Sequence, residues 1–365
     1  MNEPQATLVK ALSAAAYIDA DVYRQEQDRI FARSWQFACH VEKLRRSGDF
    51  VVCEVAGESL IVIRENDETI NAFYNFCTHR AARLLDGEGC KQRFSCPYHA
   101  WTYNTRGELV AAPNADAVPG FDVSHFGLRS CRVEVVHGLV FVNLDNDAEP
   151  LQTQFPGLID DLKTRAPDLP VLTFVHRTEA HMQANWKVAI ENYAECYHCE
   201  LIHKELVSRV LDFDSYRIEV IGKAQKHLSR PQFGTARAYD FDESTDSEFV
   251  AWWMWPNFSF QSYPGGRVHF WKWTPIDANR THLTVDWFFP SKEMADWERE
   301  LIDHHARTTF AEDLAVINSV QQGLGSRSYQ PGPLMIDRKN SRYSEHAVAA
   351  IQQLWRNAMG DTYEQ

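Results

Sequence analysis

The sequence CTHR occupies residues 77–80 of this 365-residue chain, and CPYHAW occupies residues 96–101. Sixteen residues separate the first histidine from the second cysteine. Each motif carries one thiolate and one imidazole, so two paired loops can clamp a small metal cluster from both ends. Two thiolates on one iron and two imidazoles on the other give a [2Fe-2S] centre of raised reduction potential. The expected ligands are Cys77 and Cys96 for one iron, and His79 and His99 for the other.

The two motifs resemble the ligand loops of Rieske proteins, where Pro97, Tyr98 and Trp101 also have counterparts. A structural zinc is the simpler alternative, because two cysteines and two histidines also satisfy tetrahedral zinc. Zinc fingers usually pair cysteine with cysteine and histidine with histidine along the chain, whereas each arm here carries one of each. Absorption spectroscopy separates the two, since zinc is colourless.

The length and composition are those of a globular protein with two domains. The formal net charge is −13 and no Lys/Arg-rich run is present, which argues against nucleic acid or an anionic membrane as a partner. No apolar run reaches the roughly 18 residues that would span a bilayer, and residues 1–30 lack the apolar core of a signal peptide. We therefore expect a cytoplasmic protein. Its eight scattered cysteines favour metal-binding thiols over a disulfide framework.

Residue patterns divide the chain into three parts. Residues 1–36 read as helical, with apolar side chains along one side of a helix over residues 21–35. Short alternating runs, punctuated by glycines and acidic residues, predict a small all-β domain over residues 37–145 that carries the two cluster loops. Residues 145–150 are polar, end in a proline and read as a linker.

The remaining residues, 150–365, are predicted to form an α+β domain. Its helices are expected over residues 151–164, 186–199, 291–323 and 344–359, and its first strand over residues 171–182. Residues 216–290 are strand-like and rich in tryptophan and phenylalanine, which predicts an antiparallel sheet with one filled face and helices on one side.

A second metal site is indicated near residue 200. His198 and His203 are five residues apart, which is too far for one regular turn, so the helix must end or bulge for both imidazoles to face one ion. Asp313, on a helix over residues 308–320, is the candidate third ligand, and Glu312 is its competitor. Two neutral imidazoles and one carboxylate form the facial triad of non-haem Fe(II) oxygenases, which leaves coordination positions open.

Two cysteines flank the first of these histidines. Cys196 and Cys199 could instead form a Cys/His zinc site with the same imidazoles. If the facial triad is correct, they are small buried packing residues. A one-electron cluster about a hundred residues upstream favours the triad, because such a cluster needs a site to which it delivers electrons.

In this order and separation, the two sites resemble those of the oxygenase α subunit of Rieske non-haem iron oxygenases, over nearly the whole chain. The resemblance implies a Rieske domain inserted near the N-terminus of a helix-grip catalytic domain, with residues 1–36 packed on the catalytic part. It also implies a head-to-tail ring, expected to be a homotrimer, in which one subunit's cluster lies beside the next subunit's iron. An acidic residue then bridges the two sites by hydrogen-bonding a histidine ligand of each. Here that residue is Glu195, one turn before His198.

With a glutamate at this bridging position, the chain resembles the branch of the family that attacks quaternary or N-methylated amines. That branch includes carnitine monooxygenase, glycine betaine monooxygenase and stachydrine demethylase. The string NYAECYHC at residues 192–199 and the segment at residues 319–329 are similar to that branch. Aromatic faces recognise a trimethylammonium group, which cannot donate a hydrogen bond. The tryptophans that could form such a cage, or could simply be core residues, are Trp252, Trp253, Trp255, Trp271 and Trp273.

The first cluster loop departs from the carnitine enzyme, since Thr78 and residues 81–83 replace an expected Pro and Gly-His-Glu. The family implies electrons from NAD(P)H through a separate flavin and iron-sulfur reductase, and C–H hydroxylation that leads to C–N cleavage or demethylation. The alternatives are a mono- or dioxygenase of aromatic acids, an electron-transfer or iron-storage protein, and a zinc-stabilised interaction module.

Overall fold

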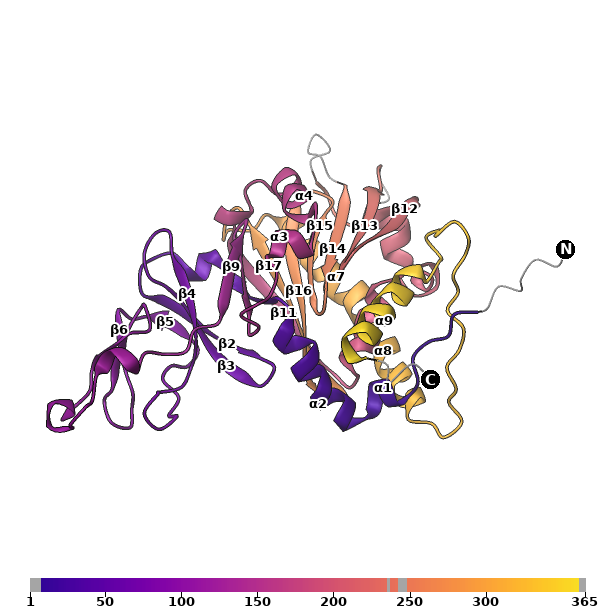
Figure 1. Cartoon of the computed structure of the whole chain (residues 1–365). Coiled ribbons are helices and arrows are strands. Elements are labelled where there is room, and N and C mark those ends of the chain that lie inside the picture. Colours follow the sequence, from indigo (N-terminus) through magenta and orange to yellow (C-terminus); the bar gives the residue numbers. More distant parts are fainter. Residues whose placement is uncertain (1–7, 235–236, 242–247, 361–365) are drawn as a thin grey trace. The chain divides into compact units, whose positions relative to one another are not determined.

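The computed structural model describes residues 8–234, 237–241 and 248–360 (Figure 1). The chain divides into two compact units. One unit comprises Phe31–Leu151 and Leu169–Val171, and the other comprises Met1–Ile30, Gln152–Asp168 and Leu172–Gln365. The predicted fold class, an all-β domain combined with an antiparallel sheet and helices, is confirmed.

The smaller unit is built from three antiparallel sheets, in the strand orders β4-β3-β2-β5, β1-β10-β9 and β6-β7-β8. This unit also contains short 3₁₀ turns: η1 (Phe31–Arg33), η2 (Val41–Leu44), η3 (Ala115–Ala117), η4 (Val123–His125) and η5 (Leu169–Val171). The strands are β1 (Gln36–His40), β2 (Asp49–Val55), β3 (Glu58–Arg64), β4 (Ile70–Tyr74), β5 (Glu88–Cys90), β6 (Arg93–Ser95), β7 (Thr102–Asn104), β8 (Leu109–Ala111), β9 (Arg132–Val136) and β10 (Leu139–Asn143).

Strand β3 divides the interior of this unit into two cores. Side chains alternate between the faces of a strand, so Leu60 and Val62 enter one cluster while Ile61 and Ile63 enter the other. The second cluster also contains both cysteines of the motifs at residues 77–80 and 96–101. The two predicted cluster loops therefore rest on a packed apolar base.

The larger unit contains one seven-stranded antiparallel sheet in the order β11-β17-β16-β15-β14-β13-β12. Six consecutive strands form a meander, and the first strand of the unit joins at the β17 edge. The strands are β11 (Thr173–Met182), β12 (Leu211–Ile221), β13 (Ala224–Pro231), β14 (Phe249–Met254), β15 (Phe258–Tyr263), β16 (Arg267–Asp277) and β17 (Arg280–Phe289).

Helical segments accompany this sheet (Figure 1). They are α1 (Ala15–Ile18), α2 (Ala20–Arg29), α3 (Leu151–Gln154), α4 (Leu158–Arg165), α5 (Trp186–Tyr193), α6 (Cys199–Ile202), α7 (Asp296–His305), α8 (Ala311–Leu324) and α9 (His346–Met359), with π-helical segments η6 (Leu206–Val210) and η7 (Ala306–Phe310). None of the helices in the described part of the chain has the length and apolar character needed to cross a membrane.

The two faces of the sheet hold different helices. Trp252 on β14 donates a hydrogen bond to Asp161 of α4, whereas the ring of Trp273 lies 5.0 Å from that of Tyr193 on α5. Strand register places these two tryptophans on opposite faces, because Trp252 aligns with Phe260 and Phe270, and Trp273 is three residues further on. The expectation of helices on one side of the sheet is therefore wrong for α4.

Three predicted helices differ from the structure. The helix expected over residues 21–35 ends at Arg29, because Phe31 and Trp35 belong to the smaller unit, where the Trp35 indole donates to the Glu149 carbonyl at 2.9 Å. The helix expected over residues 151–164 is two short helices separated by residues 155–157, of which Gly157 has a φ of +78°. The helix expected over residues 186–199 stops at Tyr193 and resumes at Cys199.

A buried ion pair fixes α5, the helix that leads into the predicted iron site. Lys187 and Glu26 pair with side chains 1% and 0% exposed. The indoles of Trp186 and Trp355 also donate to the Glu26 carboxylate, at 2.8 and 2.6 Å. Helices α2, α5 and α9 therefore meet at one carboxylate, and removal of either charged partner would leave the other buried and unpaired.

Candidate metal sites

The two cluster loops have matching backbones. The Ala81 N–H donates to the Cys77 carbonyl at 2.9 Å, and the Ala100 N–H donates to the Cys96 carbonyl at 3.0 Å. Both alanines are left-handed, with φ of +57° and +59°. Each loop thus makes the same tight turn four residues after its cysteine, as a cluster held from two ends requires.

The side chains of these loops fit a Rieske cluster. Cys77 and Cys96 are buried, and the rings of His79 and His99 lie 4.7 Å apart. His99 Nδ1 is buried and has no hydrogen-bond partner among the described residues, as expected for an atom reserved for a metal. The Tyr103 hydroxyl lies 3.2 Å from Cys77 Sγ and can hydrogen-bond a thiolate ligand. Such hydrogen bonds to sulfur are one means by which a protein sets a cluster's potential.

The predicted iron ligands come from two segments. Helix α5 ends at Tyr193, and the turn that follows carries His198, while His203 is the C-terminal cap of the four-residue helix α6. Asp313 lies in the first turn of α8, directly after the π-helical segment η7. A π-helical turn inside an α-helix is frequent at functional sites, and here it precedes the predicted carboxylate ligand.

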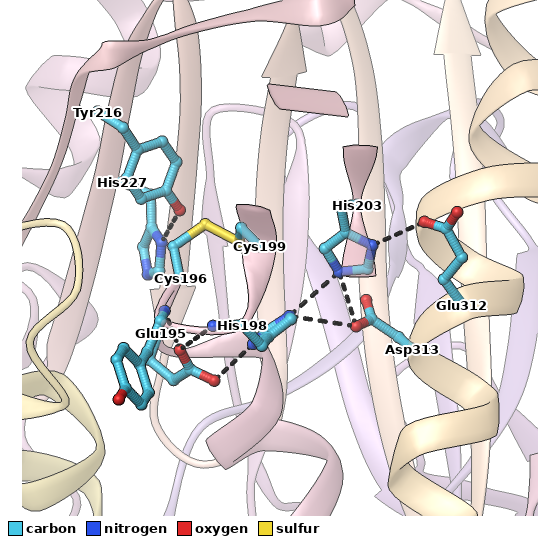
Figure 2. The surroundings of a disulfide bond; sticks show 10 residues. Glu195, Cys196, His198, Cys199, His203, Tyr216, His227, Glu312 and Asp313 are labelled. Carbon is cyan, nitrogen blue, oxygen red and sulfur yellow. Dashed lines mark hydrogen bonds and ion pairs between the residues drawn. A yellow bond between two sulfur atoms is a disulfide. The ribbon is translucent and has the colours of Figure 1, made fainter. Parts of the chain in front are cut away.

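The three ligand atoms converge on one point (Figure 2). His198 Nε2 lies 3.1 Å from His203 Nε2. Asp313 Oδ1 lies 3.5 Å from the first of these nitrogens and 2.9 Å from the second. Within the described residues, these are the three side chains that could jointly hold one ion. The structure therefore brings together all three residues predicted from the sequence.

Two glutamates set the orientation of the imidazoles. Glu195 Oε1 lies 2.5 Å from His198 Nδ1, and Glu312 Oε2 lies 2.9 Å from His203 Nδ1. If each Nδ1 donates to its carboxylate, each Nε2 presents a lone pair, and two facing lone pairs repel unless a cation lies between them. Such carboxylate–histidine pairs are characteristic of metal sites. Glu312, the predicted competitor of Asp313, thus contacts a histidine instead of the ligand atoms.

The electrostatics also favour a cation at this point. Burial lowers the pKa of His198, but hydrogen bonds to Asp313 and Glu195 outweigh burial and raise this pKa to about 10. The pKa of His203 is raised as well, because Asp313 and Glu312 outweigh its burial. Burial raises the pKa of Asp313, but its bonds to both imidazoles hold this pKa below the ordinary value. The carboxylates stabilise positive charge, which ferrous iron would supply.

Glu195 lies between two cavities. Together with His198 it lines a small cavity of about 60 Å³ beside the predicted ligands and a larger one of about 590 Å³ between α5, α8 and the loop at residues 326–334. The larger cavity also contains Glu191 and Glu345, and its lining has no lysine or arginine among the described residues. An oxygen of Glu195 can therefore face the ligand His198 while the residue borders a space open to another group.

Aromatic side chains line the small cavity. They are Tyr193, Tyr216, Phe249, Tyr263 and Trp271. Of the five tryptophans considered for a cage, Trp271 is the one that lines this cavity among the described residues, and Trp273 lines a smaller space beside α5. Trp252 lies on the other face of the sheet, and Trp253 and Trp255 are core residues. The tyrosines were not predicted to line a cavity, because Tyr216 and Tyr263 lie on separate strands and Tyr193 lies on α5, and only the tertiary fold brings them together.

Cys196 and Cys199 form a disulfide, with Cα atoms 4.9 Å apart (Figure 2). Both are buried, as predicted, but their description as separate packing residues is wrong. The zinc alternative is also not supported, because a disulfide sulfur is not a thiolate ligand. The other six cysteines, all within the described residues, are not in disulfides.

Comparisons with known proteins identify the same two parts. Residues 34–122 match the Rieske [2Fe-2S] domain, and residues 170–361 match the ring hydroxylating alpha subunit catalytic domain. The carnitine monooxygenase oxygenase subunit of Acinetobacter baumannii is 34% identical over 93% of this chain and 92% of its own length. The chloroplastic choline monooxygenase of Beta vulgaris is 31% identical over 87% of this chain and 71% of its own length. A crystal structure of the quaternary ammonium Rieske monooxygenase CntA with L-carnitine is 32% identical and superposes with a TM-score of 0.86, covering 97% of this chain and 96% of that one.

Proposed function

Because this chain belongs to the Rieske-type ring-hydroxylating oxygenase α subunits, we propose that it is the oxygenase component of a monooxygenase for a small quaternary-ammonium or N-methylated substrate. Family membership provides a Rieske [2Fe-2S] cluster and a mononuclear iron. In this proposal Cys77, Cys96, His79 and His99 hold the cluster within residues 37–145. The iron is held by His198, His203 and Asp313 within residues 150–365. Of the predicted N-terminal segment 1–36, only the part up to Ile30 belongs to the same compact unit as these residues.

One observation carries the substrate class. The cavity beside the predicted iron ligands is lined by five aromatic rings and by the carboxylates of Glu195 and Asp313, while no lysine or arginine of the described residues lines it. Aromatic faces and nearby carboxylates attract a cation that cannot donate a hydrogen bond. An aromatic acid lacks the cationic group that these ring faces and carboxylates attract. The names of the two relatives, carnitine and choline monooxygenase, agree with this choice.

The bound groups supply two kinds of chemistry: the cluster passes single electrons, and ferrous iron activates dioxygen. The protein orients both. Glu195 and Glu312 fix the tautomers of the two histidines, and the aromatic rings exclude water and hold the substrate. The overall reaction consumes one dioxygen, two electrons and two protons, converts a C–H bond to C–OH and releases one water. Hydroxylation beside the nitrogen gives a product that collapses to a carbonyl compound and a tertiary amine, because its C–N bond breaks.

Electron delivery is proposed to occur between subunits. Glu195 contacts His198 on one side and borders the 590 Å³ cavity. That position suits a carboxylate that also accepts a hydrogen bond from a cluster-ligating histidine of a neighbouring copy in a head-to-tail trimer. NAD(P)H would supply the electrons through a separate flavin and iron-sulfur reductase.

The experiment uses the full chain loaded with both metals and a surrogate reductase. NADH oxidation and product mass are measured with L-carnitine, choline, glycine betaine and benzoate. The proposal expects product only from the N-methylated compounds, with one carbonyl product and one tertiary amine per dioxygen. Product from benzoate alone would replace it with an aromatic hydroxylase, and an unchanged rate in His198→Ala would refute the assigned iron site.

A further inference from the structure

Two residues that line the small cavity, Trp271 and His227, each carry a buried ring N–H position without a hydrogen-bond partner among the described residues. His227, on β13, is 2% exposed and lines the cavity. Its Nε2 lacks any hydrogen-bond partner among the described residues. A buried donor without an acceptor costs about 1–3 kcal/mol. In a binding pocket, such an atom can be satisfied by the ligand.

The other ring nitrogen of His227 is occupied. The Tyr216 hydroxyl lies 2.7 Å from His227 Nδ1 (Figure 2). A phenol can donate or accept, and among the described residues this ring nitrogen is the acceptor within reach of its proton, so we assign the hydroxyl as the donor. His227 Nδ1 therefore accepts, and Nε2 carries the ring proton. Tyr216 thus fixes the tautomer that presents an N–H donor as the unmatched atom.

Burial keeps this imidazole neutral. Burial, assisted by the charge of His346, lowers the pKa of His227 to about 3. The ring is therefore a neutral donor and does not repel a cationic substrate in the same cavity. Its neighbours on the cavity wall, Tyr193 and Gln261, already bond each other at 3.1 Å. Among the described residues the lining contains no lysine or arginine, and the unpartnered ring nitrogens of His227 and Trp271 are left as donors for an oxygen. Trp271 is one of the aromatic rings assigned to the cationic end, which leaves His227 for the oxygen.

We propose that His227 is a specificity-determining residue, which donates from Nε2 to an oxygen at the end of the substrate remote from its quaternary nitrogen. This inference rests on the proposed function and narrows it. The preferred substrates are N-methylated amines that also carry a hydroxyl or carboxylate oxygen. The aromatic rings bind the cationic end, and His227 binds the oxygen end and so fixes which C–H bond faces the iron ligands.

The test compares ligands with and without that oxygen. Binding to the metal-loaded full chain is measured by calorimetry for choline, glycine betaine, L-carnitine and tetramethylammonium, which has no oxygen. His227→Leu removes the donor, and His227→Gln places an amide N–H near the position of Nε2. The control is His176→Leu, the same change at an exposed position on β11. Cluster absorbance and iron content must equal those of the wild type in every variant.

In His227→Leu we expect at least a ten-fold weaker affinity for the oxygen-bearing ligands and less than a two-fold change for tetramethylammonium. His227→Gln should recover part of the loss, and His176→Leu should show none. A larger loss for glycine betaine than for choline assigns the acceptor as a carboxylate, and the reverse assigns a hydroxyl. Equal losses for all four ligands, or wild-type affinity in His227→Leu, would overturn the role of His227 but leave the proposed function standing. If the wild type binds none of the four ligands, the proposed function itself fails.

Discussion

Glu312 is expected to strengthen iron binding without touching the metal. Its Oε2 lies 2.9 Å from His203 Nδ1, and the next residue, Asp313, supplies the carboxylate that faces both Nε2 atoms. In Glu312→Ala, the ring of His203 loses the acceptor that fixes its tautomer. The ring is then free to present a protonated Nε2, which cannot bind a metal.

The expected loss of Fe(II) affinity depends on how exposed the His203 and Glu312 side chains are to water. The His203 side chain is 2% exposed, so its ring proton depends on a protein acceptor, but the Glu312 side chain is 32% exposed. Water can therefore enter the space that the glutamate leaves and replace part of the hydrogen bond. Loss of a carboxylate partner of a metal-bound histidine typically costs 10–100-fold in metal affinity. We expect a loss at the lower end of this range, a ten-fold higher dissociation constant for Fe(II), which corresponds to about 1.4 kcal/mol of binding free energy.

The assay is anaerobic competition between the protein and a chelator for Fe(II), with cluster absorbance as the check on folding. Glu300→Ala, at an exposed position on α7, is the matched control and should bind iron like the wild type. Asp313→Ala should weaken binding at least a hundred-fold, because it removes a ligand. Wild-type affinity in Glu312→Ala would refute the orienting role. A loss as complete as that of Asp313→Ala would make Glu312 a ligand.

Three further predictions concern other parts of the chain. Glu195→Gln should leave both metals bound but slow single-turnover electron transfer to the iron at least ten-fold, and a variant as fast as the wild type would exclude a bridge through this residue. Burial raises the pKa of Glu191 to about 7, against bonds from Tyr17 and Gln352 and the charge of Lys187, which lower it. Between pH 4.5, the ordinary pKa of a glutamate, and about pH 7, the folded chain therefore keeps Glu191 protonated while the unfolded chain releases the proton. Stability from this group is present below the lower value and is lost as pH rises toward the upper one, by roughly 3 kcal/mol. Denaturant unfolding of Glu191→Gln should therefore show a stability gain over wild type that grows across this pH window; a constant difference would contradict it. Ala81→Gly should raise the unfolding free energy by about 1 kcal/mol, because a left-handed φ costs an alanine roughly 1–2 kcal/mol, whereas Ala82→Gly, at a position without positive φ, should lower it.

The sequence predicted those features in which chemistry dictates residue type within a short segment. A Cys-x-His arm and a Cys-x-x-His arm have few uses, and the two loops prove to share a backbone conformation through Ala81 and Ala100. The strands were predictable because side chains alternate, and Leu60 to Ile63 indeed divide between two cores. Helix ends were less predictable, since the periodicity of residues 21–35 does not reveal that Phe31 and Trp35 pack in another unit.

The pocket could not be predicted, because its walls depend on strand register. Trp252 and Trp271 look alike in a sequence, but pairing with β15 places them on opposite faces, and only Trp271 of the two lines the cavity. Likewise, the Tyr216–His227 bond joins β12 to β13, and nothing local in either strand announces it. The Cys196–Cys199 pair was ambiguous for another reason: this spacing suits a zinc site, a disulfide or simple packing, and only the position of both sulfurs decides among them.

The three carboxylates at this site have two different tasks, since one faces the predicted metal position and two orient the histidines. Three acidic side chains surround the two histidines that are predicted to bind iron, and of these three only Asp313 faces both Nε2 atoms. A single bound carboxylate neutralises half of the charge of a ferrous ion, so the metal stays electrophilic. Glu195 and Glu312 act through the far sides of the imidazoles, where they orient the rings without adding charge to the coordination sphere. Because Glu195 also borders the larger cavity, the group that orients His198 is open to a further contact on its other side.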